Sequence, residues 1–550
     1  MSGAPHRTSK SAWLYDGAAG LLCLVAFLTA RAATRGLEWP CESDLYRDMG
    51  TAQSLLDGRL GEDPAYLGER WWYPPLVPAL IGTASALSGT ALHEAYTRFG
   101  PLFNLLAPAG LYALGARLFG RGAALASLTA FLFFGQHDLM SWLHATYSPW
   151  LWPCNVAQGF FYFALYALLA SLETEKLWIA GIAGLLWGVT FLAHAAPGFL
   201  FGAIFGVLVI REAVVRRAER ASLERLFRLA LLTGGVALLV ASPYVYDLAL
   251  HYRGRIRNPA PLTWLASELS LESSAALARR LLSARGLLGL AGIAALCWPR
   301  LLPARTRSVL ATWLVFAGAG LAYGYAAQRV KLPPFLPSWH FYFYLQAFES
   351  LSLGAGMLGA LALLERGALR VFARKAPQRW IDAERWLDFG AAALLAAAVA
   401  RWPSYAERAD LTANRQASEN YAKLPEVELY TWALGHLQPT DVVLAETSPG
   451  FFVAAAGRKV VWLNDIFSNP YVKLAPRAKD ARTMLSDLVE GRYAEFSKLA
   501  TRYDVRFVAL HTDQRKRVSG AQPNVLKRRL RSKKSPGFDV YELVGARKVP

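Results

Sequence analysis

The sequence predicts a polytopic α-helical membrane protein with about eleven transmembrane helices and a C-terminal soluble α/β domain. Hydrophobic residues make up 54% of the chain and charged residues only 18%, against about 25% charged residues in ordinary soluble domains. Apolar stretches recur from residue 12 to residue 402, and most reach the length of about 20 residues that crosses a bilayer. The composition is mixed after that point. We therefore predict a transmembrane module at 1–402 and a soluble domain at 403–550.

The transmembrane helices are assigned by length and oriented by the charge of their loops. The expected spans are 12–35, 97–118, 122–137, 153–171, 176–195, 197–210, 228–248, 283–298, 308–326, 341–364 and 386–402. The apolar stretch 76–90 is short and follows a Pro-Pro pair, so we expect an interfacial or re-entrant segment there. With that choice the Arg-rich loops, such as 211–228, all fall on the cytoplasmic side, as the positive-inside rule requires.

This topology predicts a multi-pass protein of the cytoplasmic membrane, with a cytoplasmic N-terminus and an extracytoplasmic C-terminal domain. A net charge of +19 would point to nucleic acid in a soluble protein. Here the cytoplasmic Arg and Lys residues account for it, so we expect membrane lipids and no nucleic acid as partners. Neither a P-loop nor a strand-linked GxGxxG motif is present, which fits a substrate outside the cytoplasm.

The C-terminal region alternates strand-like and helix-like segments, as in a small α/β sandwich. Strands are expected at 441–447, 459–463, 505–511 and 538–544, and a helix at 483–502. The basic run 527–534 is expected to be a solvated loop, with contact to anionic lipid headgroups as the alternative.

The first outer loop, 36–96, holds most of the residues suited to chemistry. Its acidic residues include Glu42, Asp44, Asp48, Asp57, Glu62, Asp63 and Glu69, and Trp71, Trp72 and Tyr73 precede Pro74 and Pro75. Carboxylates can act as general bases or metal ligands, and aromatic faces stack on sugars. This combination favours sugar chemistry, although Trp and Tyr are also enriched at membrane interfaces as anchors.

The order of these residues resembles the GT-C superfamily of glycosyltransferases, which includes protein O-mannosyltransferases and lipid A aminoarabinose transferases. The matching pattern is Asp44-Leu-Tyr46, Ala52, Gly58-Arg59 and Tyr73-Pro74-Pro75-Leu76, followed by RLFGRGAALAS at 117–127. Each motif is loose, and their order within a matching topology carries the resemblance. The specific motifs lie in the first 130 residues.

The resemblance implies a glycosyltransferase that moves a sugar from a polyprenyl-phosphate donor to a lipid, glycan or protein acceptor at the outer membrane face. In such enzymes the first-loop Asp acts as general base or helps to bind a metal, and by position this residue is Asp44. The commoner Asp-Glu pair is absent, because Ser43 precedes Asp44, so Glu42 is a rival base. Tyr46, Tyr73, Pro74 and Pro75 belong to the motif and are expected at the substrate.

The second outer loop is a candidate to complete the site. It contains His137 and Asp138, and several members of the superfamily place a second acidic residue there. Asp138 is therefore a third candidate catalytic residue and His137 a candidate for substrate binding, with helix capping by Asp138 as the alternative. Two adjacent residues do not make a metal motif. We expect no cofactor and no required metal, although a divalent metal is compatible with this acidic site.

A lipid-phosphate donor needs cationic groups near the outer interface, and Arg suits this role because its planar fork binds phosphate bidentately. The candidates are Arg70, Arg329, Lys331 and His340. Some family members carry a Lys directly before the Pro-Pro pair, where this chain has Tyr73, so Arg70 substitutes only by proximity. His194 lies near the outer end of a span, where ionisable groups are usually functional, but an isolated His there also fits a structural role.

Two other functions fit the same topology. A transporter or flippase of a lipid-linked glycan would show similar halves with broken helices, and no internal repeat is apparent. A non-catalytic membrane scaffold would use its C-terminal domain to bind a partner or a glycan. An Asp44→Asn substitution separates these alternatives from a glycosyltransferase.

Overall fold

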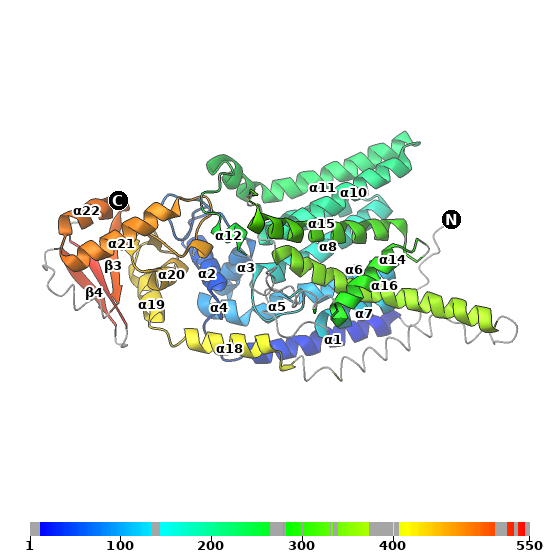
Figure 1. The fold of residues 1–550 in the computed structure, drawn as a ribbon, viewed down its shortest axis with the longest axis horizontal. Helices are drawn as coiled ribbons and strands as arrows, with labels where there is room; N and C mark the ends of the chain where they lie inside the picture. The colour runs from blue at the N-terminus through cyan, green and yellow to red at the C-terminus, as the bar shows by residue number, and fades with distance from the viewer. Residues whose placement is uncertain are drawn as a thin grey trace. The chain divides into compact units, whose positions relative to one another are not determined.

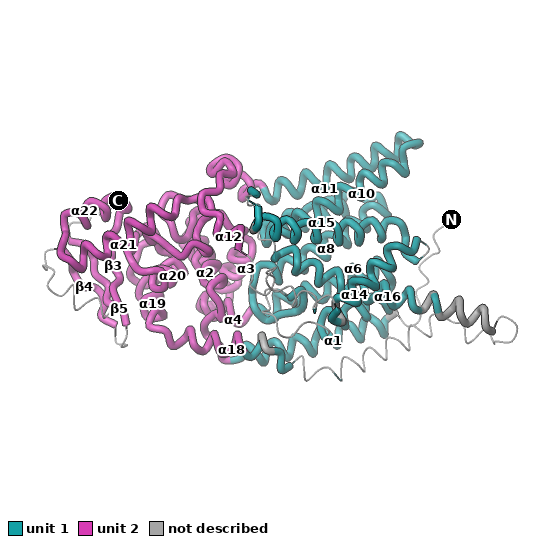
Figure 2. The backbone as a smooth tube through the Cα atoms, in the orientation of Figure 1, with its two compact units in different colours: residues 1–35, 100–241, 265–412 teal, residues 36–99, 242–264, 413–550 magenta. Residues whose placement is uncertain are grey.

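The structure is a computed structural model that forms two compact units. It describes residues 12–133, 144–264, 279, 282–299, 301–330, 332–333, 339–372, 400, 406–511, 525–532 and 537–544. Unit 1 comprises residues 1–35, 100–241 and 265–412, and unit 2 comprises residues 36–99, 242–264 and 413–550 (Figure 2). The first outer loop and the C-terminal region therefore belong to one compact unit, although they are more than 300 residues apart in the sequence.

Unit 1 is a bundle of apolar helices (Figure 1). They are α1 (Ala12–Thr34), α5 (Gly100–Phe103), α6 (Leu106–Phe119), α7 (Arg121–Phe133), α8 (Pro153–Thr174), α9 (Leu177–Ala193), α10 (Ala195–Arg216), α11 (Arg220–Tyr246), α14 (Ala284–Leu296), α15 (Ala304–Arg329) and α16 (Trp339–Phe372). The last residues of α11, from Ser242, cluster with unit 2. α10 is longer than the span expected at 197–210, because it continues through Arg211 to Arg216.

Large apolar side chains lie on the outside of this bundle. Leu24 and Leu28 of α1 are 52% and 55% exposed, and Leu238 and Leu239 of α11 are 63% and 72% exposed. Such rows are unfavourable in water and typical of a surface that faces lipid. Within the described residues, six helices are long and apolar enough to cross a membrane, and α7, α9 and most of α14 are apolar but shorter.

Ten of the eleven expected spans overlap described helices. Each expected span from 12–35 to 341–364 falls on a described helix, whereas 386–402 lies outside the described residues. The total of about eleven transmembrane helices stays a prediction. α3 (Leu76–Ser88) and α4 (Leu92–Arg98) form an apolar pair bent by 109°, where we expected an interfacial or re-entrant segment.

Small residues allow the bundle helices to pack closely. α8 is the most enclosed of the long apolar helices described, with 83% of its apolar window buried. On α9, a Cβ atom at Gly184 would lie 2.4 Å from the carbonyl oxygen of Thr233 in α11, and one at Gly188 would lie 2.7 Å from Val240. Close backbone contact at small residues is a common way for membrane helices to associate.

Unit 2 combines a five-stranded mixed sheet with short helices (Figure 1). Its remaining helical elements are α2 (Ser43–Leu56), η2 (Asp247–His251), α12 (Ala260–Thr263), α18 (Ala409–Tyr421), α19 (Glu426–His436), α20 (Thr447–Ala455), η6 (Asp465–Phe467), α21 (Leu474–Glu490) and α22 (Tyr493–Arg502). Its strands are β1 (Val442–Leu444), β2 (Lys459–Val460), β3 (Val505–His511), β4 (Leu526–Arg531) and β5 (Phe538–Leu543). α18 begins within unit 1 and continues into unit 2.

The sheet has the strand order β2-β1-β3-β5-β4. β1 runs parallel to β2 and β3, whereas β5 runs antiparallel to β3 and β4. Side chains of β1 and β3 pack with Met484 and Leu488 of α21 and Phe496 of α22 in one buried cluster. The sheet therefore has its own hydrophobic core.

Two expectations for the C-terminal region are wrong. The helix expected at 483–502 is two helices, α21 and α22, because Gly491 at φ 78° ends α21 in a left-handed conformation that favours glycine. The basic run expected as a loop at 527–534 begins as strand β4, which pairs with β5. Its Arg528 and Arg529 form ion pairs with Asp539 and Glu542 of β5. Cross-strand charge pairing of this kind stabilises an exposed edge strand.

Candidate functional site

Helix α2 carries the acidic residues of the first outer loop. Asp44 lies in its first turn, where a carboxylate interacts favourably with the helix dipole. Leu45, Met49 and Ala52 form its buried face, so burial against the rest of unit 2 fixes which way the polar residues point. The helix ends before Gly58, which has the positive φ of 77° typical of a helix C-terminus.

Arg47 joins two carboxylates on this helix. Its Nη1 lies 2.9 Å from Asp44 Oδ1 and its Nε lies 2.9 Å from Asp48 Oδ1. The spacing of i, i+3 and i+4 places all three side chains on one helix face. The side chains of Arg47 and Asp48 are 10% and 1% exposed, whereas that of Asp44 is 28% exposed. Asp44 is therefore the carboxylate of this cluster that solvent or a substrate can reach.

The aromatic residues before the Pro-Pro pair pack against this cation. The guanidinium carbon of Arg47 lies 3.6 Å from the ring centroid of Tyr73 and 5.9 Å from that of Trp72. The hydroxyl of Tyr244 donates to the backbone oxygen of Trp72 at 2.8 Å, and Pro75 caps α3. A cation over an aromatic face is stabilised by about 0.5–2 kcal/mol. The contact links α2 to the segment before α3.

Burial controls the ionisation of Asp48. It raises the pKa of this carboxyl to about 6, against the lowering effect of Arg47. Burial alone would lower the pKa of Arg47, but Asp44 and Asp48 beside it raise the pKa well above its usual value. Within the described residues, Asp48 Oδ2 and the hydroxyl of Tyr96 are buried without a hydrogen-bond partner. Arg47 stays cationic, and Asp48 is the residue of the pair that responds to pH.

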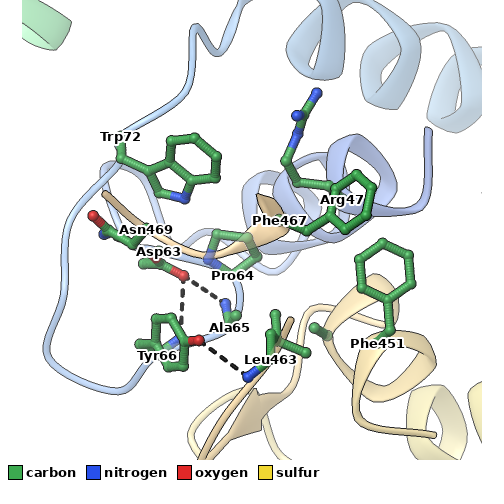
Figure 3. A pocket seen from close by; sticks show the side chains of 11 residues that line it. Arg47, Asp63, Pro64, Ala65, Tyr66, Trp72, Phe451, Leu463, Phe467 and Asn469 are labelled. Carbon is green, nitrogen blue, oxygen red and sulfur yellow. Dashed lines mark hydrogen bonds between the residues drawn. The ribbon is translucent and has the colours of Figure 1, made fainter. Parts of the chain in front are cut away.

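A small pocket of about 20 Å³ lies next to this cluster (Figure 3). It is lined by Arg47, Asp63, Pro64, Ala65, Tyr66, Trp72, Phe451, Ala454, Leu463, Phe467 and Asn469. These residues come from the first outer loop and from the segments that follow β1 and β2. In Figure 3, Trp72 and Asn469 lie on one side of the pocket and Phe451 on the other. The C-terminal region therefore supplies part of the wall beside Arg47.

A buried polar network around Asp63 holds the loop against the sheet. Asp63 Oδ1 accepts from the backbone N–H groups of Ala65 and Tyr66 at 2.7 and 3.1 Å, and Oδ2 accepts from Asn469 Nδ2 at 2.8 Å. The fully buried Lys459 donates to the backbone oxygen of Asp63. Burial raises the pKa of Asp63 and lowers the pKa of Lys459 to about 8. Polar groups this deeply buried depend on being paired, so the network fixes the loop conformation.

No protein-family model and no curated protein matches the sequence. Solved structures do match. ArnT from Cupriavidus metallidurans bound to undecaprenyl phosphate superposes with a TM-score of 0.53 at 14% identity, over 98% of this chain and 99% of ArnT. An Archaeoglobus fulgidus oligosaccharyltransferase tethered to an acceptor peptide gives a TM-score of 0.51 at 14% identity, over 97% of this chain and 74% of the other.

A third similar structure is the arabinofuranosyltransferase AftD from Mycobacteria, with a TM-score of 0.51 at 11% identity. It is matched over 98% of this chain and 40% of AftD. The chain has the GT-C fold. The resemblance in the first-loop motifs is thus confirmed at the level of the fold. Tyr46 of the Asp44-Leu-Tyr46 motif is fully buried and donates its hydroxyl to the Pro40 carbonyl, a position that supports α2.

The remaining candidates from the first outer loop occupy different surroundings. Glu42 is the N-cap residue of α2 and has an extended backbone. Pro74 and Pro75 are buried. Arg70 is 46% exposed at its side chain, and its Nε lies 3.9 Å from Asp247 Oδ1. Arg70 therefore has a carboxylate neighbour in unit 2, and its charge is partly offset.

Two candidates in unit 1 come together although 145 residues separate them. His194 is the residue between α9 and α10, where the backbone becomes extended (φ −162°, ψ 132°). His340 lies in the first turn of α16. Their ring centroids are 4.1 Å apart in an edge-to-face arrangement, and both side chains are buried. In the predicted topology both lie at the outer end of the bundle.

Other candidates are exposed or outside the described residues. Arg329 ends α15 and is exposed. His137, Asp138 and Lys331 lie outside the described residues. Over the part of the chain that the structure describes, no cluster of three or more His, Cys, Asp or Glu side chains is arranged to hold a metal. The roles of all the candidates stay predictions.

Sequence reasoning missed Arg47, Phe451 and Asn469. A signal for Arg47 existed, because Asp44, Arg47 and Asp48 have the spacing of one helix face. Phe451 and Asn469 lie about 400 residues beyond α2 and carry no motif. Only the fold brings them to the pocket.

Proposed function

We propose that the chain is a glycosyltransferase that moves a sugar from a polyprenyl-phosphate donor to an acceptor at the outer face of the cytoplasmic membrane. Asp44 is the general base in this proposal. The GT-C fold supports it, because ArnT was solved with undecaprenyl phosphate and an Archaeoglobus fulgidus oligosaccharyltransferase with an inhibitory peptide and dolichol phosphate. The single observation that carries the assignment is the partly exposed Asp44 carboxylate, held by Arg47 at 2.9 Å.

The geometry favours Asp44 over the neighbouring carboxylates. A general base must reach the proton that it removes, and Asp44 is more exposed than Asp48 by 28% to 1%. Arg47 binds Asp44 Oδ1, which leaves Oδ2 for an acceptor hydroxyl. The adjoining Trp72 and Tyr73 rings offer apolar faces of the kind that stack on sugars. Glu42 remains the alternative base.

The proposed reaction is a single displacement. An acceptor hydroxyl gives its proton to Asp44 as its oxygen forms a bond to the anomeric carbon of the donor sugar. The bond between that carbon and the phosphate oxygen breaks, and the electron pair leaves with the polyprenyl phosphate. Attack from the face opposite the phosphate inverts the anomeric centre. The step moves a proton and a sugar and needs no oxidant or reductant.

The leaving phosphate needs positive charge or hydrogen-bond donors. The candidates in the proposal are Arg70 in unit 2 and, separately, Arg329, Lys331 and the His194–His340 pair in unit 1. The pair is the most specific of these candidates, because two buried imidazoles in contact are unusual in an apolar bundle. His194→Gln and His340→Gln are each expected to weaken binding of undecaprenyl phosphate to the detergent-solubilised protein. Unchanged binding in both variants would assign the pair a structural role.

The decisive experiment is the Asp44→Asn substitution. The amide has nearly the same shape but cannot accept the proton, and general bases contribute about 10²–10⁴-fold to rate. We expect transfer of labelled sugar from a polyprenyl-phosphate donor to fall by about 10²-fold or more, with the Tm and the binding of polyprenyl phosphate unchanged. Glu38→Gln is the matched control, since Glu38 is an exposed acid of the same loop.

The outcomes separate the competing functions. Loss of transfer in Glu42→Gln with retention in Asp44→Asn would move the base to Glu42. Transfer that is unchanged in both would contradict the proposed mechanism and favour a flippase or scaffold. For a flippase, movement of a fluorescent lipid-linked sugar across proteoliposomes would survive in the absence of any acceptor.

A further inference from the structure

We propose that a basic groove in unit 2 binds an anionic saccharide as the acceptor. This inference rests on the proposed function and names its substrate class. The groove has a volume of about 490 Å³, within the range of about 300–1,000 Å³ for small-molecule sites. It is lined by Arg257, Asn258, Pro259, Asp465, Leu474, Ala475, Ala478, Lys479, Arg482 and Thr483.

Three cations outnumber one carboxylate in this groove. Arg257 lies on the wall formed by the segment after η2, and Lys479 and Arg482 rise from α21. All three are exposed, and among the described residues none of them has an ion-pair partner. The Arg482 guanidinium lies 4.9 Å from the ring centroid of Trp462, which limits its freedom. Free cations gathered in a concave site attract anions more strongly than the same charges spread over a surface.

Hydrogen bonds hold the opposite wall in place. The backbone N–H groups of Arg257 and Asn258 donate to the Pro470 carbonyl at 2.8 and 2.9 Å. Asn258 Nδ2 donates to the backbone oxygen of Asp465 at 2.8 Å, and Asn258 Oδ1 accepts from the backbone of Ala260 at 3.2 Å. The two segments therefore form one fixed wall. A site whose walls are already ordered loses less conformational entropy on binding.

The other wall is one face of α21. Ala475, Ala478 and Arg482 follow the spacing of i, i+3 and i+7 that lines up side chains on a helix. The two alanines leave room between the cations, where a pyranose ring can lie. Asp465 and Thr483 add a carboxylate and a hydroxyl at the same groove, both of which bind sugar hydroxyls.

This composition fits a saccharide better than a membrane surface. A patch that docks onto anionic lipid needs cations alone, and the Asp465 carboxylate in the groove would be repelled by a dense layer of headgroups. Arg257, Lys479 and Arg482 supply positive charge along this groove. A carboxylate or phosphate on the saccharide would pair with these cations.

The test measures binding to the full-length chain in detergent, in the Asp44→Asn background so that no transfer occurs. The probes are trigalacturonate, which is anionic, and maltotriose, which is neutral. Their binding is measured by calorimetry. The groove variant is Lys479→Gln/Arg482→Gln. The matched control, Lys498→Gln/Lys527→Gln, removes the same charge from exposed positions outside the groove.

Trigalacturonate should bind more tightly than maltotriose and lose affinity with added salt. The groove variant should weaken trigalacturonate binding by about tenfold or more, since each charge-assisted contact contributes about 1.5–3 kcal/mol. Of the single variants at position 479, Lys479→Gln should lose affinity and Lys479→Arg, which keeps the positive charge, should retain it. Equal weakening in the control variant, equal affinity for the two sugars, or groove-dependent binding to phosphatidylglycerol vesicles alone would overturn the inference. The assay contains no sugar donor and measures binding alone, so failure of the proposed function would leave this binding result intact.

Discussion

Replacing Arg47 with glutamine tests the electrostatics around α2 in the most detail. In the wild type, burial raises the pKa of Asp48 from 3.8 to about 6, and this difference corresponds to about 3 kcal/mol. The folded state holds the proton more tightly than the unfolded chain. The contribution of Asp48 to stability is therefore greatest below about pH 4, falls as the pH rises to about 6, and is constant above that.

Arg47 lowers the pKa of Asp48, so its removal raises that pKa further. The variant then continues to lose stability between about pH 6 and pH 7, by about 1.4 kcal/mol per pH unit, while the wild type does not. Loss of the Asp44 ion pair and of the contact with Tyr73 adds a destabilisation that does not come from the Asp48 titration. The stability gap between variant and wild type should thus be wider at pH 7 than at pH 5 by about 1.4 kcal/mol.

The assay is thermal unfolding of the detergent-purified protein at the two pH values. Arg47→Gln should lower Tm at both, and more at pH 7. Adding Asp48→Asn to this variant removes the titrating group, so the extra loss at pH 7 should disappear. Arg47→Lys keeps a cation and should show a smaller pH-dependent gap. A gap of equal size at pH 5 and pH 7 would refute the assignment of the raised pKa to Asp48.

The remaining predictions concern the packing and the buried polar network of unit 2. Gly50→Ala should destabilise the protein by about 1–3 kcal/mol, because the new Cβ would lie 2.3 Å from the Ala454 carbonyl oxygen. Gly435→Ala, in a helix with open space around this position, should leave stability unchanged or raise it by up to about 1 kcal/mol. A Tm that falls for Gly435→Ala as much as for Gly50→Ala would contradict this packing. Burial lowers the pKa of Lys459 to about 8, so the unfolded chain binds more protons above that pH and stability should rise with pH. The Tm of Lys459→Met should lack this rise between pH 8 and 9.5, and a parallel rise in both proteins would contradict it. Asn469→Ala removes a donor to Asp63 and should lower stability by about 1–3 kcal/mol, measured in the same way.

The sequence predicted the helical bundle well because span length and loop charge depend on local composition. The bend between α3 and α4 was visible in the short apolar stretch after the Pro-Pro pair. β4 was missed because its Arg residues, which resemble a solvated loop, balance acids on β5 that only strand pairing brings opposite them.

The candidate site was predicted in part. Asp44 and Tyr73 were found from local motifs, and both lie beside Arg47. The pocket wall from Phe451 and Asn469 could not be found, because long-range packing leaves no local signal. His194 and His340 were each suspected alone, and their contact depends on the arrangement of α9, α10 and α16.

The proposed transfer reaction depends most on the side of the membrane that the first outer loop faces. In a chain whose own cysteines are replaced, Glu38→Cys reports on this loop and Ala218→Cys on the turn between α10 and α11, both at exposed positions. A membrane-impermeant maleimide applied to intact spheroplasts should label the first variant at once and the second only after permeabilisation. Labelling in the reverse order would place Asp44 in the cytoplasm, away from the proposed donor, and would contradict the assignment of a transfer reaction to this site.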